Sequence, residues 1–489
     1  MSAYTGGELA LWAGAAWEPR EPRVTGGISK DSRTTARGDV YVALSGPRFD
    51  GHDFVGPAFD KGACGAVVRG DYPLPATPER PLLRVRDPLE ALRAMAAGFL
   101  REVAPEVIAV TGSAGKTTVK EMIAEVLCRA GRTARSPGNW NNDIGLPLSI
   151  LSMERSAELG VFEIGMNHPG ELGPLCGLLR PSWGVVTNVG PVHMHAFDSV
   201  EAVADEKASL LRSLPADGVA FLNLDGGCYD LLSAAAPCRK VVVSTTGGPA
   251  DYVLRERSAS EGTGRIEETQ SGETKAIRCP LPGEHNLANA LFAVAAGRAH
   301  GLDWEPIAEA ISRCPALDMH WERRTVGGVH VINDGYNANP LSACAAVRTF
   351  AVQEGSDRKW LVLAGMLELG ARATQEHRAL GRLVGEGDWQ GLVAVGDLGS
   401  AVADGAEEAG MPADRVIRCA DNLEAATRLD ERVLPGDSVL FKGSRGMHVE
   451  EILEAFVKQH NRQSNVRRDR HGAARIHGER RLVGDGAGS

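Results

Sequence analysis

The stretch that decides the fold is Thr111-Gly-Ser-Ala-Gly-Lys-Thr-Thr118. It follows an apolar run at residues 107–110 and precedes apolar positions with helical spacing at residues 119–127. This order predicts a strand, a tight turn and a helix. Unpaired amides at a helix N-terminus, together with the helix dipole, favour a phosphate. The segment is therefore predicted to bind the phosphates of ATP through Thr111, Gly112, Ser113, Ala114, Gly115, Lys116, Thr117 and Thr118.

Individual residues of this phosphate loop (residues 111–118) have distinct expected roles. Gly112 and Gly115 allow a tight turn and a close approach of the backbone to phosphate, Lys116 supplies a mobile positive charge, and the Thr117 hydroxyl can ligate Mg²⁺. The spacing departs from the common Gly-x-x-x-x-Gly-Lys-[Ser/Thr] pattern, because Val110 occupies the first glycine position. A glycine-rich turn before an ordinary helix is the alternative, and the flanking strand and helix favour phosphate binding.

The bulk composition restricts the class of protein. A chain of 489 residues is too long for one core and predicts about three domains. The net charge of -10 argues against general nucleic-acid binding, which depends on clustered Lys and Arg. Nine cysteines without a Cys-x-x-Cys pair indicate reduced thiols in a cytoplasmic protein. The sequence has neither a signal-peptide pattern nor an apolar run of about 18 residues, so no membrane association is expected.

The pattern of apolar segments predicts an α/β protein of three domains followed by a tail. Residues 1–100 have the pattern of a small mixed domain, and a helix is expected at 89–103. Residues 101–316 alternate short strands and amphipathic helices, which predicts a parallel sheet, and the polar segment 251–278 suggests an antiparallel edge or insertion. Residues 317–460 repeat the alternation. Residues 461–489 are rich in Arg and Gly and are predicted to be a disordered basic tail.

Polar residues near strand ends are candidates for chemistry, because open α/β sheets bind ligands at the carboxyl ends of their strands. Glu163 lies in an apolar strand, where a carboxylate is costly unless it is paired or bound to metal. A salt-bridged edge residue is the alternative. His193 and His195 follow the next strand, and Lys207 lies in a helical pattern. Solvated loop histidines and a solvated helix lysine are the corresponding alternatives.

The motifs taken together resemble those of the Mur ligases. The resemblance runs from about residue 26 to residue 455 and covers all three predicted domains. The first domain carries Asp31-Ser-Arg33, Gly38-Asp-Val-Tyr-Val-Ala-Leu-Ser-Gly46 and Arg48-Phe-Asp-Gly-His-Asp-Phe54. The second carries the phosphate loop, Gly138-Asn-Trp-Asn-Asn-Asp-Ile-Gly-Leu-Pro147 and Pro282-Gly-Glu-His-Asn-Leu-Ala-Asn289. The third carries Asn333-Asp-Gly-Tyr-Asn-Ala-Asn-Pro340, Glu368-Leu-Gly370, His377 and Lys442-Gly-Ser-Arg445.

The resemblance implies a fold and roles for particular residues. The implied architecture is a UDP-substrate-binding domain (1–100), a central ATP-binding domain (101–316) and a Rossmann-like ligase domain (317–460). Lys116, His193 and Lys207 are the implied catalytic residues, and Lys207 matches a lysine that becomes carbamylated in the family. The implied ligands of Mg²⁺ are Thr117, Glu163, His193 and Lys207. The implied ATP contacts outside the loop are Asn286, Asn289 and Asp334, and the implied substrate contacts are Ser32, Arg33, Asn139 and Asn142.

The activity implied by the resemblance is ATP-dependent ligation. The similarity is greatest to the members that join D-alanyl-D-alanine to UDP-N-acetylmuramoyl-tripeptide in peptidoglycan precursor synthesis. ATP and Mg²⁺ are the expected cofactors, the two substrates are the expected partners, and a monomer is expected. The implied mechanism forms an acyl phosphate, which an amine then converts to an amide.

Several positions depart from the family pattern. Counting back from Asn333, the arginine that usually reaches ATP falls at Met319, and Arg323 or Arg324 could replace it only by a local shift of the chain. The usual acidic residue before Met366 is absent, and Ala208-Ser209 follows Lys207 in place of Gly-Glu. The alternatives are a diverged ligase for another carboxylate and amine, an ATP-dependent switch or kinase, an inactive nucleotide-binding protein and a folylpolyglutamate-type ligase. The first-domain motifs favour a UDP-linked substrate.

Overall fold

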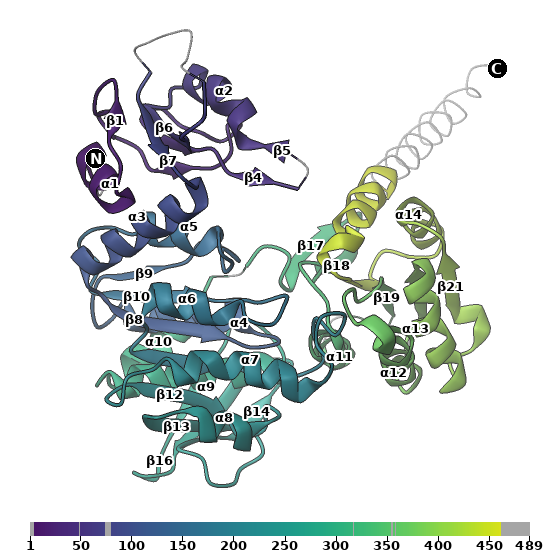
Figure 1. The fold of residues 1–489 in the computed structure, drawn as a ribbon. Coiled ribbons are helices and arrows are strands. Elements are labelled where there is room, and N and C mark those ends of the chain that lie inside the picture. Colours follow the sequence, from purple (N-terminus) through teal and green to yellow (C-terminus); the bar gives the residue numbers. More distant parts are fainter. Residues whose placement is uncertain are drawn as a thin grey trace, which may run out of the picture.

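Three mostly parallel β-sheets organise the chain (Figure 1), and they confirm the predicted α/β class. The computed structural model describes residues 4–460, apart from residues 48, 74–79, 316, 354–355 and 357. The predicted tail, residues 461–489, lies outside the described residues. In the part of the chain that is described, no helix is long and apolar enough to cross a membrane. The limits assigned to the three domains stay predictions.

The first sheet has the order β1-β7-β6-β3-β2, and β1 is its antiparallel strand. A short hairpin, β4 and β5, and helices α1 to α3 complete the first unit. The predicted helix at 89–103 is α3, which begins after Asp87, whose carboxylate accepts hydrogen bonds from the amides of Leu89 and Glu90. The elements are α1 (Gly6–Ala13), β1 (Trp17–Glu18), β2 (Ile28–Ser29), β3 (Val40–Val42), β4 (Ser45–Gly46), β5 (Phe49–Asp50), η1 (Gly51–Phe54), α2 (Val55–Asp60), β6 (Gly65–Arg69), β7 (Leu82–Val85) and α3 (Pro88–Val103).

The central sheet has the order β16-β15-β14-β13-β12-β11-β8-β10-β9 and is parallel from β9 to β14. The antiparallel strands β14 to β16 confirm the edge expected at residues 251–278. Helices α4, α9 and α10 pack on one face of this sheet. Helices α6, α7 and α8 contribute to the apolar core on the opposite face. The strands are β8 (Glu106–Thr111), β9 (Thr133–Arg135), β10 (Leu159–Glu163), β11 (Trp183–Val186), β12 (Val219–Asn223), β13 (Arg239–Ser244), β14 (Tyr252–Ser258), β15 (Thr263–Glu268) and β16 (Glu273–Arg278). The helices are α4 (Lys116–Leu127), α5 (Gly145–Leu151), α6 (Leu172–Leu179), α7 (Val200–Arg212), α8 (Tyr229–Ala235), α9 (Glu284–Ala299) and α10 (Trp304–Ser312).

The position of β8 in this sheet locates the functional site. After β8 the chain adds β9 and β10 on one side, and then crosses over to add β11 on the other side. Such a reversal of direction opens a crevice at the carboxyl ends of the strands, where open α/β sheets bind ligands. The phosphate loop leaves β8 at this crevice.

The third sheet has the order β17-β18-β22-β19-β20-β21, with β17 antiparallel to β18. Apolar clusters cover both of its faces, and this unit lies beside the central one (Figure 1). The strands are β17 (Glu322–Val326), β18 (Val329–Asn333), β19 (Lys359–Leu363), β20 (Gly391–Val395), β21 (Val416–Cys419) and β22 (Ser438–Lys442). The helices are α11 (Pro340–Ala351), η2 (Gly370–Arg372), α12 (Ala373–Gly385), α13 (Gly396–Glu408), η3 (Ala413–Arg415), α14 (Asn422–Asp430) and η4 (Arg445–Met447).

Candidate active site

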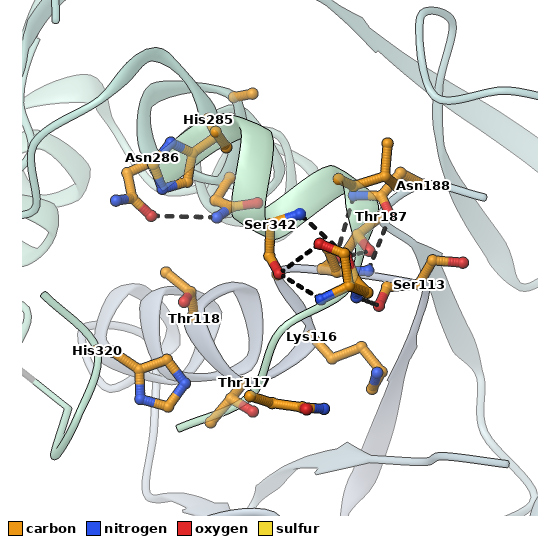
Figure 2. Close-up of a pocket in the computed structure, with 18 of the residues that line it drawn as sticks. Ser113, Lys116, Thr117, Thr118, Thr187, Asn188, His285, Asn286, His320 and Ser342 are labelled. Carbon is orange, nitrogen blue, oxygen red and sulfur yellow. Dashed lines mark hydrogen bonds between the residues drawn. The ribbon is translucent and has the colours of Figure 1, made fainter. Parts of the chain in front are cut away.

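A cavity of about 610 Å³ lies between the central and C-terminal units. The central unit contributes the phosphate loop and the start of α9, and the C-terminal unit contributes residues that follow β18 and begin α11. Figure 2 shows Ser113 and Lys116 of the loop, Asn286 of α9, and His320 and Ser342 from the C-terminal unit around this space. Both units are therefore needed to form the cavity.

The phosphate loop is held by the end of the neighbouring strand, β11. The Thr187 hydroxyl donates a hydrogen bond of 2.6 Å to the Ala114 carbonyl, and the Ala114 amide donates one of 2.9 Å to Asn188 Oδ1 (Figure 2). Helix α4 begins at Lys116, and no side chain caps its N-terminus. The first amides of this helix have no intrahelical partner, which makes them available to an anion.

The surroundings of Gly112 and Gly115 leave no space for a side chain at either position. A Cβ on Gly112 would lie 1.8 Å from Thr187 Oγ1, and a Cβ on Gly115 would lie 2.6 Å from Asn289 Oδ1. Gly115 also has a φ of +78°, a conformation that side chains disfavour. The predicted tight turn is present, and the structure adds that Thr187, directly after β11, and Asn289, in helix α9, leave no room for a side chain at these two positions.

Glu163 lies at the end of β10 and is 1% exposed. Its Oε2 accepts a hydrogen bond of 2.8 Å from the Thr117 hydroxyl, and its Oε1 accepts one of 2.7 Å from Asn141 Nδ2. Strand β10 is flanked by β8 and β9, so the alternative of a salt-bridged edge residue does not apply. Thr117 and Glu163 present hard oxygen donors at the cavity wall, a set that suits Mg²⁺, which binds through one or two carboxylates together with substrate phosphates and water.

Two lysines lie close enough to influence each other electrostatically. Lys116 Nζ donates to the Gly112 carbonyl at 3.1 Å, and burial lowers the pKa of Lys116 while Glu163 opposes that shift. Lys207, on α7, is 2% exposed, and burial followed by repulsion from Lys116 lowers its pKa well below the usual value. The alternative of a solvated helix lysine is therefore wrong.

His193 follows β11 but does not line the cavity. Its Nδ1 lies 2.6 Å from Glu368 Oε2 of the C-terminal unit, and His193 holds the pKa of Glu368 below its usual range. Across the described ranges no group of three or more His, Cys, Asp or Glu residues could hold a metal ion. A metal site shared by Thr117, Glu163, His193 and Lys207 stays a prediction.

Three residues predicted to contact ATP line the cavity, namely Asn286, Asn289 and Asp334. Asn286 Nδ2 donates to the Pro282 carbonyl at 2.8 Å, and its Oδ1 accepts from Asn289 Nδ2 at 3.3 Å. Asp334 forms an ion pair of 2.7 Å with Lys442. Sequence reasoning did not assign Lys442 to the site, although the motif that ends at Arg445 contained it.

The predicted substrate residues have different surroundings. Asn139 lines the cavity, whereas Asn142 Oδ1 accepts a hydrogen bond of 2.8 Å from the Gly145 amide at the start of α5. Asn141, which sequence reasoning missed, lines the cavity and binds Glu163. Ser32 and Arg33 follow β2 in the first unit and do not line this cavity. Their predicted roles stay predictions.

The position that departs from the family arginine also lies outside the cavity lining. Met319 Sδ is 3.1 Å from Arg445, and the next residue, His320, lines the cavity and packs on Tyr336 with ring centroids 4.5 Å apart. The two suggested substitutes, Arg323 and Arg324, lie on β17 and line a separate depression. Neither residue lines the cavity in this structure, so the suggestion that one of them reaches the nucleotide after a local shift stays a prediction.

Comparison with known proteins agrees with this architecture. Residues 110–297 match the family model of the Mur ligase middle domain, and residues 319–445 match that of the Mur ligase glutamate ligase domain. The UDP-N-acetylmuramoyl-tripeptide--D-alanyl-D-alanine ligase of Bacillus subtilis is 37% identical, with 90% of this chain and 94% of the relative covered. The enzyme of the same description from Escherichia coli is 32% identical, with 88% and 93% covered.

Solved structures agree as well. MurF from Acinetobacter baumannii superposes with a TM-score of 0.81 at 30% identity, with 93% of this chain and 99% of that chain covered. MurF ligase from Thermotoga maritima, solved in complex with ADP, gives a TM-score of 0.75 at 27% identity, with 90% and 99% covered. Fold and site thus define an ATP-dependent ligase built from three α/β units. The chain belongs to the Mur ligase family, which confirms the resemblance.

Proposed function

We propose that this chain uses ATP to join D-alanyl-D-alanine to UDP-N-acetylmuramoyl-tripeptide in peptidoglycan precursor synthesis. The observation that carries the proposal is the cavity in which the phosphate loop and Glu163 of the central unit face Asp334 and Lys442 of the C-terminal unit. The B. subtilis and E. coli relatives support it, because both bear the name of this ligase and match about nine-tenths of the chain.

The proposed reaction has two steps. A carboxylate oxygen of the tripeptide attacks the γ-phosphorus of ATP, so that an O–P bond forms and ADP leaves. The amine nitrogen of D-alanyl-D-alanine then attacks the acyl carbon, a C–N bond forms, phosphate leaves and the nitrogen loses a proton. The amides at the start of α4 and the Lys116 ammonium hold the phosphates, and Asn139 and Asn141 lie beside them on the cavity wall.

Thr117 and Glu163 are the residues proposed to hold Mg²⁺, together with His193 and a carbamylated Lys207. When bound, the ion neutralises phosphate charge. Lys207 is suited to carbamylation because it is buried beside Lys116, and the described residues offer its amine no ion-pair or hydrogen-bond partner. A neutral Lys207 amine adds to CO₂ through a new N–C bond and releases one proton, which leaves an anionic oxygen-rich group in place of an ammonium.

Three further residues are proposed to contact the muramoyl substrate. Ser32 and Arg33 would contact the UDP part of the substrate, and Asn142 would approach the reacting carboxylate. The enzyme would act as a cytoplasmic monomer. All nine cysteines are free thiols, which supports a reducing compartment.

The test is phosphate release from ATP with each substrate alone and with both. The proposal predicts release only when UDP-N-acetylmuramoyl-tripeptide and D-alanyl-D-alanine are both present. Full turnover with neither substrate would indicate an ATPase or switch. No turnover with both substrates would indicate either a ligase for another substrate pair or an inactive nucleotide-binding protein.

A further inference from the structure

Residues 366–370, named the latch segment here, lie between β19 and α12 of the C-terminal unit and contact the loop after β11 of the central unit. The segment contains Glu368 and Gly370, which the proposed reaction does not use. It is braced by His377, a buried histidine that also has no part in that reaction.

The latch segment contacts the central unit through both a side chain and the backbone. Glu368 Oε2 accepts a hydrogen bond of 2.6 Å from His193 Nδ1, and the Glu368 carbonyl accepts one of 3.2 Å from the His195 amide. A hydrogen bond from an imidazole to a carboxylate fixes both the orientation of the ring and the nitrogen that carries the proton. The orientation of His193 therefore depends on a residue of the other unit.

The backbone of the latch segment has an uncommon conformation at this contact. Glu368 has a φ of +68°, and Gly370 has a φ of +54°. A Cβ on Gly370 would lie 2.9 Å from the Met194 carbonyl and 3.2 Å from His195 Cα. A non-glycine residue keeps a left-handed conformation only where its surroundings impose it, and such positions concentrate at functional sites.

The latch segment is also held firmly within its own unit. His377 is 0% exposed, its Nε2 accepts a hydrogen bond of 2.8 Å from the Met366 amide, and its Nδ1 donates one of 2.6 Å to the Ala373 carbonyl. The Leu367 amide donates to Ser444 Oγ at 2.9 Å. These bonds couple the position of the segment to that of the whole C-terminal unit.

We propose that the latch segment seats the C-terminal unit on the central unit, and that Glu368 is a positioning residue which orients His193 only when the two units are closed. The inference rests on the proposed function, because that proposal places His193 in the site. Lys116 and Asn286 line the cavity from the central unit, and in the described part of the chain neither is hydrogen-bonded to Glu368, so the central unit's hold on ATP and closure of the latch can be tested separately.

The test uses two substitutions in the latch segment of the full-length chain. Glu368→Ala removes the carboxylate, and Gly370→Ala keeps it but places a methyl group against the Met194 carbonyl. We expect both to lower kcat about 10- to 100-fold, the range of one hydrogen bond to a charged group, and to change KM for ATP less than about 3-fold. Small-angle X-ray scattering with ADP and Mg²⁺ should give a larger radius of gyration for both variants than for wild type.

Glu386→Ala, at an exposed position at the end of α12, is the matched control and should behave as wild type. Wild-type kcat and scattering in Glu368→Ala would overturn the inference, and so would a lowered kcat with unchanged scattering in both variants. Should wild type release no phosphate with the two proposed substrates, only the proposed function fails. In that case the comparison of the radius of gyration between wild type and the two variants still tests whether the latch segment holds the two units together.

Discussion

The Thr117 hydroxyl donates a 2.8 Å hydrogen bond to Glu163 Oε2, which joins the first turn of α4 to the end of β10. The two residues are 46 positions apart in the chain, and both line the cavity between the units. The hydroxyl and the carboxylate can ligate a cation, and the free amides at the start of the neighbouring helix can bind the phosphates that accompany it. This pair is the structural basis of the proposed use of Mg-ATP.

Glu163→Gln is expected to lower kcat about 100-fold or more, because the amide keeps the shape of the side chain but removes the negative charge that faces the cation. Calorimetry should show that Mg²⁺ strengthens ADP binding to wild type and not to the variant. Glu158→Gln, at an exposed position before the same strand, is the control. Equal strengthening by Mg²⁺ in wild type and Glu163→Gln would refute the role of this carboxylate.

Gly115→Ala is expected to raise KM for ATP about 10-fold or more. The substitution combines left-handed strain of about 1–2 kcal/mol with a contact of 2.6 Å to Asn289 Oδ1, which displaces the loop. Gly170→Ala is the matched control, because Gly170 has a φ of +85° and nothing within 4 Å of the added Cβ. Steady-state kinetics with varied ATP checks both. A KM for ATP in Gly115→Ala as low as that in Gly170→Ala would contradict the requirement for glycine at position 115.

Lys207→Ala is expected to abolish ligation, because the alanine cannot form the proposed carbamate. Added small carboxylic acids should restore part of the activity by supplying oxygen ligands in the vacated space. Phosphate release with and without these acids is the measurement, and Lys458→Ala, at a side chain 74% exposed, is the control. Unchanged activity in Lys207→Ala would show that ligation does not need a carbamate at this position.

Position 319 gives a prediction that follows from the structure and differs from the sequence expectation. Met319 contacts Arg445 and does not line the cavity, so Met319→Arg should leave KM for ATP within about 3-fold of wild type. His320→Ala removes a side chain that lines the cavity and packs against Tyr336, and it should raise that KM about 3- to 10-fold. The reverse ranking in ATP-dependent kinetics would show that position 319 faces the nucleotide.

Elements with a strong local pattern were predictable from sequence. The apolar run before Thr111 and the helical spacing after Thr118 predicted β8, the turn and α4, and the structure has all three. Lys116 and Thr117 followed from the same pattern, because the chemistry of phosphate binding requires those residue types at that spacing. Local order thus predicted the half of the site that lies on one continuous segment.

The other half depends on contacts between units, which no local pattern specifies. The arrangement of Glu368 against His193, and of Asn339 Nδ2 against the Ser113 carbonyl at 3.1 Å, requires the C-terminal unit to lie on the central one. Asn141 and Asn142 are neighbours with the same side chain, and only the turn into α5 decides which one faces Glu163. The sequence could not show which of the adjacent residues Met319 and His320 lines the cavity, because this also depends on how the two units meet.

The central claim is that ATP activates a substrate carboxylate as an acyl phosphate. It is tested most directly with UDP-N-acetylmuramoyl-tripeptide carrying ¹⁸O in its reacting carboxylate, together with ATP, Mg²⁺ and D-alanyl-D-alanine. Mass spectrometry of the released phosphate is the measurement. The account predicts one ¹⁸O transferred to phosphate for each amide formed, and amide formation with unlabelled phosphate would contradict it.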